Sequence, residues 1–164
     1  MEDPTAYCDS PVGWIRITGN HLGIKAITFL DEKPEILANP PECLQPAVNQ
    51  LHEYFAGNRR AFDLKIVSAG TEFQEKVWNE LRKIPFGVTI SYTELAGKLG
   101  SIGAVRAVGH ANGCNPLNII TPCHRVIGSG GQLTGYGGGL WRKEWLLKFE
   151  KAVTLPGLFQ QVTE

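Results

Sequence analysis

The feature that most constrains the fold of this chain is a change in hydrophobic pattern near Ser68-Ala69-Gly70. Before this point, short runs of β-branched and aromatic residues are typical of strands. After it, apolar residues recur every three or four positions, as they do in helices. A chain of 164 residues has the length of one ordinary domain or of two small ones. The change in pattern favours two, and we expect domains at residues 1–69 and 70–164.

The N-terminal half is expected to combine a small sheet with one helix. Two runs with strand character, Val12 to Thr18 and Leu22 to Leu30, are separated by the turn dipeptide Gly19-Asn20, so the pattern predicts a hairpin. A helix is predicted from Leu44 to Phe55, because the apolar residues there have helical spacing. A short strand is predicted from Phe62 to Val67.

The C-terminal half is expected to be mostly helical. Thr71 and Gln74 have the spacing of a capping box, which predicts the start of a helix. Two short helices are predicted from about Tyr92 to Leu99 and from about Ala104 to Asn112, and an amphipathic helix from about Leu140 to Lys151. Two short helices joined by a glycine-containing turn resemble a helix-turn-helix, although helical hairpins that bind nothing share this pattern.

Charge is distributed unevenly along a chain whose formal net charge is zero. Taken alone, that zero argues against a nucleic-acid partner. However, residues 1–70 carry nine acidic and six basic side chains, whereas residues 71–164 carry seven and ten. Residues 82–148, which contain the expected helix-turn-helix, carry eight basic and two acidic side chains. This excess suits binding to a phosphate backbone, while a surface neutralised by acids nearby in three dimensions would give the same count.

Targeting, membrane and metal signals are not evident in the sequence. No apolar run approaches the roughly 18 residues of a membrane span, and the N-terminus lacks the features of a signal peptide, so we expect no membrane partner and a cytoplasmic location, or a nuclear one in a eukaryote. The four cysteines, Cys8, Cys43, Cys114 and Cys123, are too few for a disulfide scaffold, and no two have the spacing of a metal knuckle. We expect no metal, no cofactor and one reduced, reactive cysteine.

The segment around Cys123 suggests a nucleophile on a stiff, buried approach, because the cysteine follows an apolar run and Pro122. A thiolate needs a nearby base or positive charge, since a free thiol has a pKa of about 8.5. Neighbouring residues of an extended chain point to opposite faces, so we expect His124 to reach the thiol through a bridging water. Glu150 is the candidate acceptor that orients His124. The alternative without chemistry is a buried cysteine beside a surface histidine.

A set of motifs between residues 70 and 151 carries a family resemblance. The central motif is Pro122-Cys123-His124-Arg125-Val126. It is accompanied by Ile84-Pro85-Phe86-Gly87, Ser91-Tyr92, Ala107-Val108-Gly109, Ala111-Asn112-Gly113, Asn115-Pro116, Gly135-Tyr136-Gly137-Gly138-Gly139 and Lys143-Glu144-Trp145-Leu146-Leu147. Together they resemble the O6-alkylguanine-DNA alkyltransferases, also called methylated-DNA-protein-cysteine methyltransferases. The resemblance implies an α+β fold: a small mixed α/β domain with a ribonuclease-H-like sheet, then a mostly helical domain with a winged-helix-like helix-turn-helix.

The resemblance also implies an activity, direct-reversal DNA repair by a suicide enzyme. Cys123 is similar to the family's acceptor, which takes an alkyl group from O6 of guanine, and less well from O4 of thymine, in one irreversible turnover. The implied partner is double-stranded DNA containing O6-alkylguanine, bound by a monomer, with cooperative loading left open. The alternative is a lesion-sensing DNA-binding regulator without alkyl transfer. A cysteine hydrolase would need repeated turnover, which the adjacent Cys123 and His124 disfavour.

Individual roles follow from the same resemblance. His124 is similar to the water-mediated base, and Glu150 to the residue that orients it. Asn115 matches the asparagine that bridges the helix-turn-helix to the active-site turn, and Tyr92 the tyrosine that hydrogen-bonds the flipped guanine. Arg106 matches the arginine that fills the gap left by the extruded nucleotide. The other expected DNA contacts are Ala107, Gly109, Ala111, Asn112, Gly113 and Arg125. The expected base pocket comprises Tyr92, Val126, Tyr136 and Gly137, the last in place of a serine found in some members.

Overall fold

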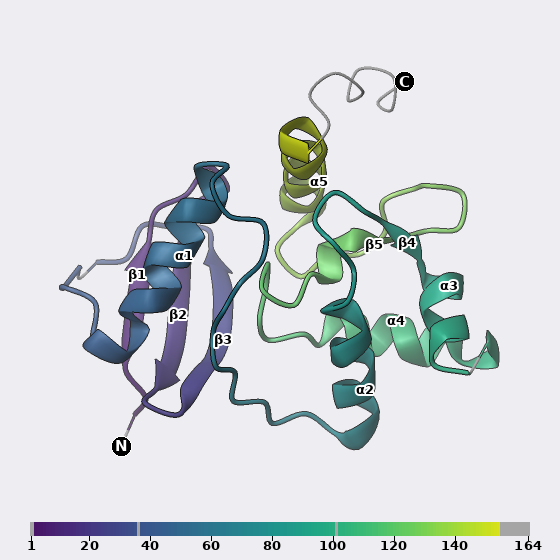
Figure 1. Cartoon of the computed structure of the whole chain (residues 1–164), viewed down its shortest axis with the longest axis horizontal. Helices are drawn as coiled ribbons and strands as arrows, with labels where there is room; N and C mark the ends of the chain where they lie inside the picture. Colours follow the sequence, from purple (N-terminus) through teal and green to yellow (C-terminus); the bar gives the residue numbers. More distant parts are fainter. Residues whose placement is uncertain (1, 36, 101, 155–164) are drawn as a thin grey trace. The chain divides into compact units, whose positions relative to one another are not determined.

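An antiparallel sheet in the first half of the chain and a set of helices in the second give this protein an α+β fold (Figure 1). The computed structural model describes residues 2–35, 37–100 and 102–154. The backbone divides into two units. One comprises the chain up to Ala69 together with Pro116–Ile120, and the other comprises Gly70–Asn115 and the chain from Thr121 onward. The expected fold class is confirmed. The sequence did not predict that a short segment of the second half, Pro116–Ile120, belongs to the first unit.

The sheet of the first unit has the order β1-β2-β3, with β1 at Thr5–Cys8, β2 at Trp14–Asn20 and β3 at Gly23–Leu30. Buried and less buried residues alternate along β2, as the two-residue period of a strand requires. Gly23 has a φ of 152°, and a Cβ there would lie 2.7 Å from the carbonyl oxygen of Lys65. Only glycine fits at this position.

The predicted hairpin is confirmed, but its predicted turn is wrong. Gly19 and Asn20 are the last residues of β2, and His21-Leu22 forms the turn. The pairing of β2 with β3 has a register irregularity between Thr18 and Gly19, which accommodates a turn at His21-Leu22. Strand β1 was outside every predicted element, because four residues are too few for an alternating pattern to be recognised.

Helix α1, at Gln45–Phe55, confirms the helix predicted in this half and packs across one face of the sheet (Figure 1). It follows the short 3₁₀ helix η1 at Glu42–Leu44. The strand predicted from Phe62 to Val67 is wrong, because only Ile66 forms an isolated β-bridge there. Gln50 of α1 explains part of this: its side chain donates to the carbonyl of Asp63 at 3.0 Å and accepts from the N–H of Asp63 at 2.9 Å. These backbone groups are satisfied by a side chain instead of a neighbouring strand.

The second unit begins with α2 at Glu72–Leu81, which starts with the predicted capping box. The Gln74 N–H donates to the Thr71 hydroxyl at 3.1 Å, and the Thr71 N–H donates to the Gln74 side chain at 3.0 Å. Helix α3 at Tyr92–Lys98 begins with a second capping box, between Ser91 and Glu94. The N-terminal ends of both helices are therefore fixed by local sequence.

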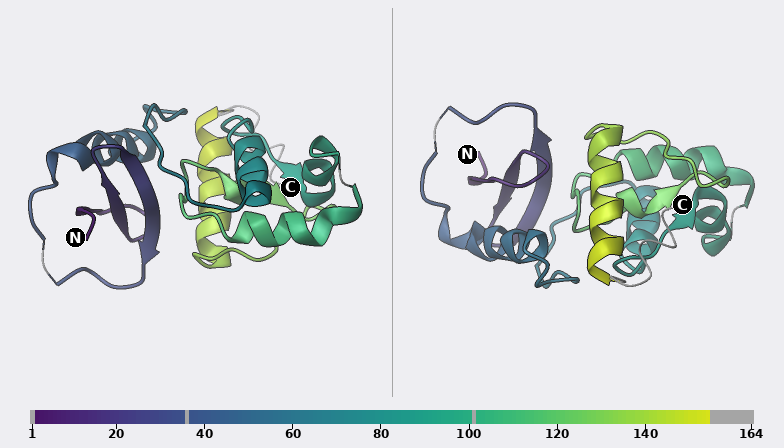
Figure 2. Two further views of the ribbon diagram at one scale, coloured as in Figure 1. Left: turned by 90° about the horizontal axis from the view of Figure 1, so that it is seen from below. Right: turned by 90° about the horizontal axis from the view of Figure 1, so that it is seen from above.

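Helices α3 and α4, the latter at Val105–Gly113, form the predicted helix pair, with the 3₁₀ turn η2 at Ile102–Ala104 before α4. Two short parallel strands, β4 at Ile90–Ser91 and β5 at Val126–Ile127, tie the start of α3 to the segment after Cys123. Helix α5 at Leu140–Thr154 packs beside the 3₁₀ turn η3 at Cys123–Arg125, as both views of Figure 2 show.

The core of the second unit gathers side chains from α2, α3 and α4, from β4 and β5, and from η3. It contains Val77, Trp78, Leu81, Ile84, Ile90, Leu95, Ala96, Val108, Ala111, Cys123 and Val126. The candidate nucleophile is therefore part of the hydrophobic core of the helix-turn-helix unit. Within the described residues, no helix is long and apolar enough to cross a membrane.

Candidate active site

Cys123 opens η3 on a backbone that Pro122 shapes. Pro122 has φ −81° and ψ 64°, and the Cys123 N–H donates to the carbonyl of Thr121 at 2.8 Å. These values define an inverse γ-turn, and the proline ring sets the φ that this turn needs. The Cys123 side chain is 4% exposed. The approach to the cysteine is therefore stiff and buried, as its sequence predicted.

A strained turn lies just upstream, at Ile119. Ile119 has a φ of 72°, and the Ile120 N–H donates to the carbonyl of Asn118 at 2.8 Å. Ile119 is the one non-glycine residue with a positive φ among those the structure describes. This conformation is costly for a β-branched side chain and tends to occur near functional sites. Burial of Ile119, which is 1% exposed, holds it in place.

His124, Arg125 and Glu150 form a buried cluster beside the cysteine. Nε2 of His124 and Oε2 of Glu150 are 2.8 Å apart. Arg125 donates from Nε to Oε1 and from Nη2 to Oε2 of Glu150, each at 2.9 Å. Burial alone would raise the pKa of Glu150, but the charges and hydrogen bonds of His124 and Arg125 hold it well below its usual range. Glu150 is ionised, and it orients the ring of His124.

The other nitrogen of His124, Nδ1, is buried and has no hydrogen-bond partner among the described residues. The premise that Cys123 and His124 lie in extended chain is wrong, because both belong to η3. The expectation that His124 reaches the thiol through a bridging water still agrees with the geometry, since no hydrogen bond joins His124 to the thiol within the described part of the chain. Nδ1 thus remains available to a water molecule or another small group.

Arg125 is a correction to the expected DNA contacts. Its side chain is buried, and besides binding Glu150 it donates from Nη1 to the carbonyl of Ile84 at 2.6 Å. Its guanidinium also lies 5.8 Å from the centre of the Phe86 ring. A planar group engaged in this way has no access to a phosphate. Arg125 instead neutralises Glu150 and fixes its position.

Asn115 connects the end of α4 with the cysteine turn. Its Nδ2 donates to the carbonyl of Thr121 at 2.7 Å, and its side chain also hydrogen-bonds Cys123. Burial raises the pKa of the Cys123 thiol, whereas the hydrogen bond with Asn115 and the charge of Lys143 lower it. Asn115 therefore favours the thiolate form of Cys123 and fixes the turn that carries it.

Lys143 was not recognised from the sequence as a site residue. Its side chain is fully buried, its Nζ donates to the carbonyl of Thr134 at 2.9 Å and lies 5.7 Å from the centre of the Tyr92 ring. A signal was present in the spacing, because Lys143, Leu146 and Glu150 follow one another at helical intervals on α5. Two charged residues on the same stripe as a buried leucine indicate a polar site in the core.

The exposed side of α4 is narrower than the sequence predicted. Arg106, Ala107 and Gly113 are exposed, and Gly109 is half-buried beside Tyr92. Ala111 and Asn112, which were expected to contact DNA, are buried. The Trp78 indole donates to the carbonyl of Ala111 at 2.8 Å, and the Asn112 amide lies 3.5 Å from the carbonyl oxygen of Cys123. These two residues attach α4 to the core, because they lie on the inner face of the helix.

The four expected base-pocket residues differ in exposure. Tyr92 and Tyr136 are half-buried and pack against the core that contains Cys123 and Val126. Burial raises the pKa of Tyr136 well above its usual value, and negative charge on Cys123 and Glu150 adds to this. Gly137 is exposed, and a Cβ there would meet no atom within 4 Å. The structure therefore leaves room for a serine at position 137.

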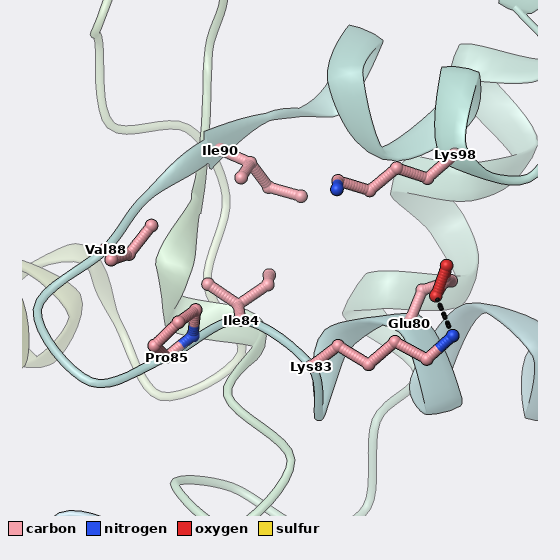
Figure 3. Close-up of a pocket in the computed structure, with 7 residues that line it drawn as sticks. All are labelled: Glu80, Lys83, Ile84, Pro85, Val88, Ile90 and Lys98. Atoms are coloured by element: carbon pink, nitrogen blue, oxygen red, sulfur yellow. Dashed lines mark ion pairs between the residues drawn. The ribbon is translucent and has the colours of Figure 1, made fainter.

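The basic excess of residues 82–148 is only partly available at the surface. Arg125, Arg142 and Lys143 are buried, and Lys148 pairs with Glu144 at 2.9 Å. Figure 3 shows a small pocket whose lining includes Lys83 and Glu80, which pair at 2.8 Å. The other residues that line it are Ile84, Pro85, Val88, Ile90 and Lys98. The charge count therefore overstated the basic face, because it included side chains that serve the core.

Comparisons with known proteins agree on one family. The model described as "6-O-methylguanine DNA methyltransferase, DNA binding domain" matches residues 72–152, and the model of the ribonuclease-like domain of the same enzymes matches residues 5–67. A methylated-DNA-protein-cysteine methyltransferase of Methanosarcina acetivorans is 47% identical over 150 residues, which cover 88% of this chain and 96% of that protein.

Solved structures are similar over nearly the whole chain. The crystal structure of the Mycobacterium tuberculosis O6-methylguanine methyltransferase has a TM-score of 0.83 at 42% identity and covers 98% of this chain and 99% of its own. A crystal structure of the M. tuberculosis protein in complex with DNA has a TM-score of 0.83 at 44% identity, with 94% and 97% covered.

Proposed function

Since the chain belongs to the methylated-DNA-protein-cysteine methyltransferase family, we propose that Cys123 is the residue that accepts the alkyl group. The overall activity is direct-reversal DNA repair. The observation that carries the assignment is a buried cysteine in the core of the DNA-binding unit, hydrogen-bonded by Asn115 and adjacent to the His124–Glu150 pair. Among the four cysteines, Cys123 alone has this neighbourhood in the described structure.

The reaction needs a thiolate and a route for its proton. A water bound to Nδ1 of His124 would pass the thiol proton to the ring, and Glu150 would stabilise the resulting imidazolium. The thiolate then attacks the alkyl carbon, so that the sulfur–carbon bond forms as the carbon–O6 bond breaks. The purine leaves with the electron pair and takes up one proton. Cys123 keeps the alkyl group as a thioether, and each molecule reacts once.

The target base must leave the duplex before it can reach a buried thiol. Rotating a nucleotide out of the helix costs a few kcal/mol, and least for a badly paired base. The exposed face of α4, with Arg106, Ala107 and Gly113, suits a close approach to DNA, and Arg106 would occupy the vacated space. Tyr92 and Tyr136, which pack against the core around Cys123, would bind the extruded O6-alkylguanine. A monomer bound to double-stranded DNA is sufficient for these steps.

The test is the stoichiometry of transfer. The protein is mixed with a duplex that contains one O6-methylguanine, and the intact mass and the peptide masses are measured. We expect one methyl group per molecule, on the peptide that holds Cys123. Cys123→Ser should abolish transfer, whereas Cys114→Ser, which changes an exposed cysteine, should leave the stoichiometry unchanged.

The alternative, a lesion-sensing DNA-binding regulator, makes the opposite prediction. Such a protein would bind the alkylated duplex without any gain in mass. Transfer that survives in Cys123→Ser would refute the assignment of the acceptor, and binding without transfer would favour the regulator.

A further inference from the structure

The ammonium group of Lys143 is buried without a carboxylate partner. Within the described part of the chain, it forms no ion pair, and its one hydrogen bond is to the neutral carbonyl of Thr134 at 2.9 Å. Lys143 also lies in the first turn of α5, where the helix dipole disfavours positive charge. Buried charges are normally paired, so neither burial nor helix position explains this lysine by stability alone.

The groups around Lys143 show what its charge can act on. From α3, the Tyr92 ring lies 5.7 Å from Nζ and offers its negative face. From η3, Cys123 belongs to the core against which the Tyr92 ring packs. The charges of Cys123 and Lys143 also act on each other, since each favours the charged form of the other. The other titratable groups near the thiol are less suited to stabilise a negative charge on its sulfur. Glu150 is negative, and His124 and Arg125 are both paired with Glu150, which offsets their charge. Tyr136 stays protonated because burial raises its pKa.

We propose that Lys143 is the charge partner of Cys123: its buried ammonium stabilises the thiolate form of the acceptor and so speeds alkyl transfer. The inference rests on the proposed role of Cys123. The free energy that a buried, unpaired ammonium costs is offset when the nearby thiol ionises, so the two groups favour each other's charged forms. The effect is reciprocal. Burial lowers the pKa of Lys143, and a negative Cys123 raises it again.

The hydrogen bond to the carbonyl of Thr134 fixes the position of the Lys143 ammonium. Thr134 belongs to the glycine-rich segment that also carries Tyr136, whose ring packs against the core beside Cys123. The ammonium therefore contacts both this segment and the Tyr92 ring, and Tyr92 and Tyr136 both pack against the core that contains Cys123. Lys143 is a positioning and charge-stabilising residue, because it acts through the thiol and not on the substrate directly.

The first experiment measures the pH dependence of alkyl transfer from free O6-benzylguanine, which needs no DNA. Lys143→Met keeps the length and apolar character of the side chain but removes its charge. We expect the rate to fall about tenfold at neutral pH, the effect of losing one nearby opposite charge, and the profile to move to higher pH. Lys143→Arg should restore much of the profile. Lys148→Met, which removes an exposed charge from the same helix, is the matched control and should behave as the wild type.

A second measurement uses the unaltered protein and so does not depend on a variant that folds. Lysine labelled with carbon-13 is titrated by NMR before and after complete alkylation of Cys123. The thioether is neutral, so the pKa of Lys143 should be lower in the alkylated protein.

The outcomes separate this inference from the proposed function. A Lys143→Met profile that is slowed without a shift along the pH axis, or a Lys143 pKa that alkylation leaves unchanged, would overturn the charge partnership. If the wild type itself transfers no alkyl group to Cys123, the proposed acceptor is wrong instead.

Discussion

Glu150 supports two functions with a single carboxylate, since it orients His124 and neutralises Arg125. Burial would raise its pKa, but the two cationic partners lower it well below the ordinary value of 4.5. Ionised Glu150 therefore stabilises the folded state at every pH above that value. The stabilisation is lost as the pH falls from 4.5 through the lowered pKa. Over that range, the carboxylate binds a proton more readily in the unfolded chain than in the folded protein.

Glu150→Gln should lower the free energy of unfolding by about 3–5 kcal/mol at neutral pH, because it leaves the Arg125 charge buried beside a neutral amide. It should also flatten the loss of stability in acid. Urea unfolding at neutral pH and at a series of acidic values measures both effects. Glu144→Gln, which breaks an exposed pair with Lys148, is the control and should cost about 1 kcal/mol or less. Equal urea midpoints for Glu150→Gln and the wild type would contradict the role of the cluster.

The roles of single residues were predictable from the sequence where the resemblance named them. They were less predictable where the role depends on whether a charged side chain is buried. The His124–Glu150 contact joins residues 26 positions apart. The need of a catalytic histidine for an acceptor made Glu150 a candidate, and the family motif indicated the same role. Arg125 and Lys143 were misjudged for one physical reason. A basic side chain is normally exposed, so a charge count assigns it to the surface, whereas here the core holds both groups.

In the proposed function, the exposed face of α4 contacts DNA, and Arg106 is the arginine exposed on this helix. Arg106→Ala should slow transfer from duplex DNA on the order of 10- to 100-fold, since the gap left by the extruded base would stay unfilled at a cost of a few kcal/mol. Reaction with free O6-benzylguanine should be unaffected. Single-turnover rates on both substrates measure the difference.

Lys98→Ala provides the control for that comparison, because it removes an exposed charge from α3 of the same helix pair. Its effect on duplex substrate should be small and should shrink as salt is added. Slowing of duplex and free base to the same extent by Arg106→Ala would refute the extrusion role.

Elements with a local signal were predicted well, and those formed by distant pairing were not. The capping box at Thr71 and the apolar spacing of α1 located two helices. Strands β4 and β5 are two residues each, and they form because a segment before α3 meets the segment after Cys123. No periodicity fits within two residues, so such strands are visible only once the tertiary fold is known.

At the scale of the whole molecule, the division near residue 70 was expected, but the return of Pro116–Ile120 to the first unit was not. The apolar character of this segment was visible in the sequence, yet a buried strand, a buried loop and a piece of another unit share that signal. Its partner is β3: the Ile27 N–H donates to the carbonyl of Pro116 at 2.8 Å, and the Asn118 amide donates to the carbonyl of Ile27 at 2.8 Å. Long-range hydrogen bonds of this kind, and not the local sequence, determine the unit to which Pro116–Ile120 belongs.

That return has a consequence for any attempt to separate the two halves. Residues 70–164 produced alone would retain Leu117 and Ile119, both buried in the intact protein, without β3, with which Leu117 forms a β-bridge. We expect this fragment to aggregate and to transfer little alkyl group, and fragment 1–69 supplied with it to restore both solubility and transfer. Gel filtration and transfer stoichiometry measure the rescue, and a lone fragment that is monodisperse and fully active would contradict it. The C-terminal half is therefore not expected to work as an independent module, because the segment that leads to Cys123 belongs to the N-terminal unit.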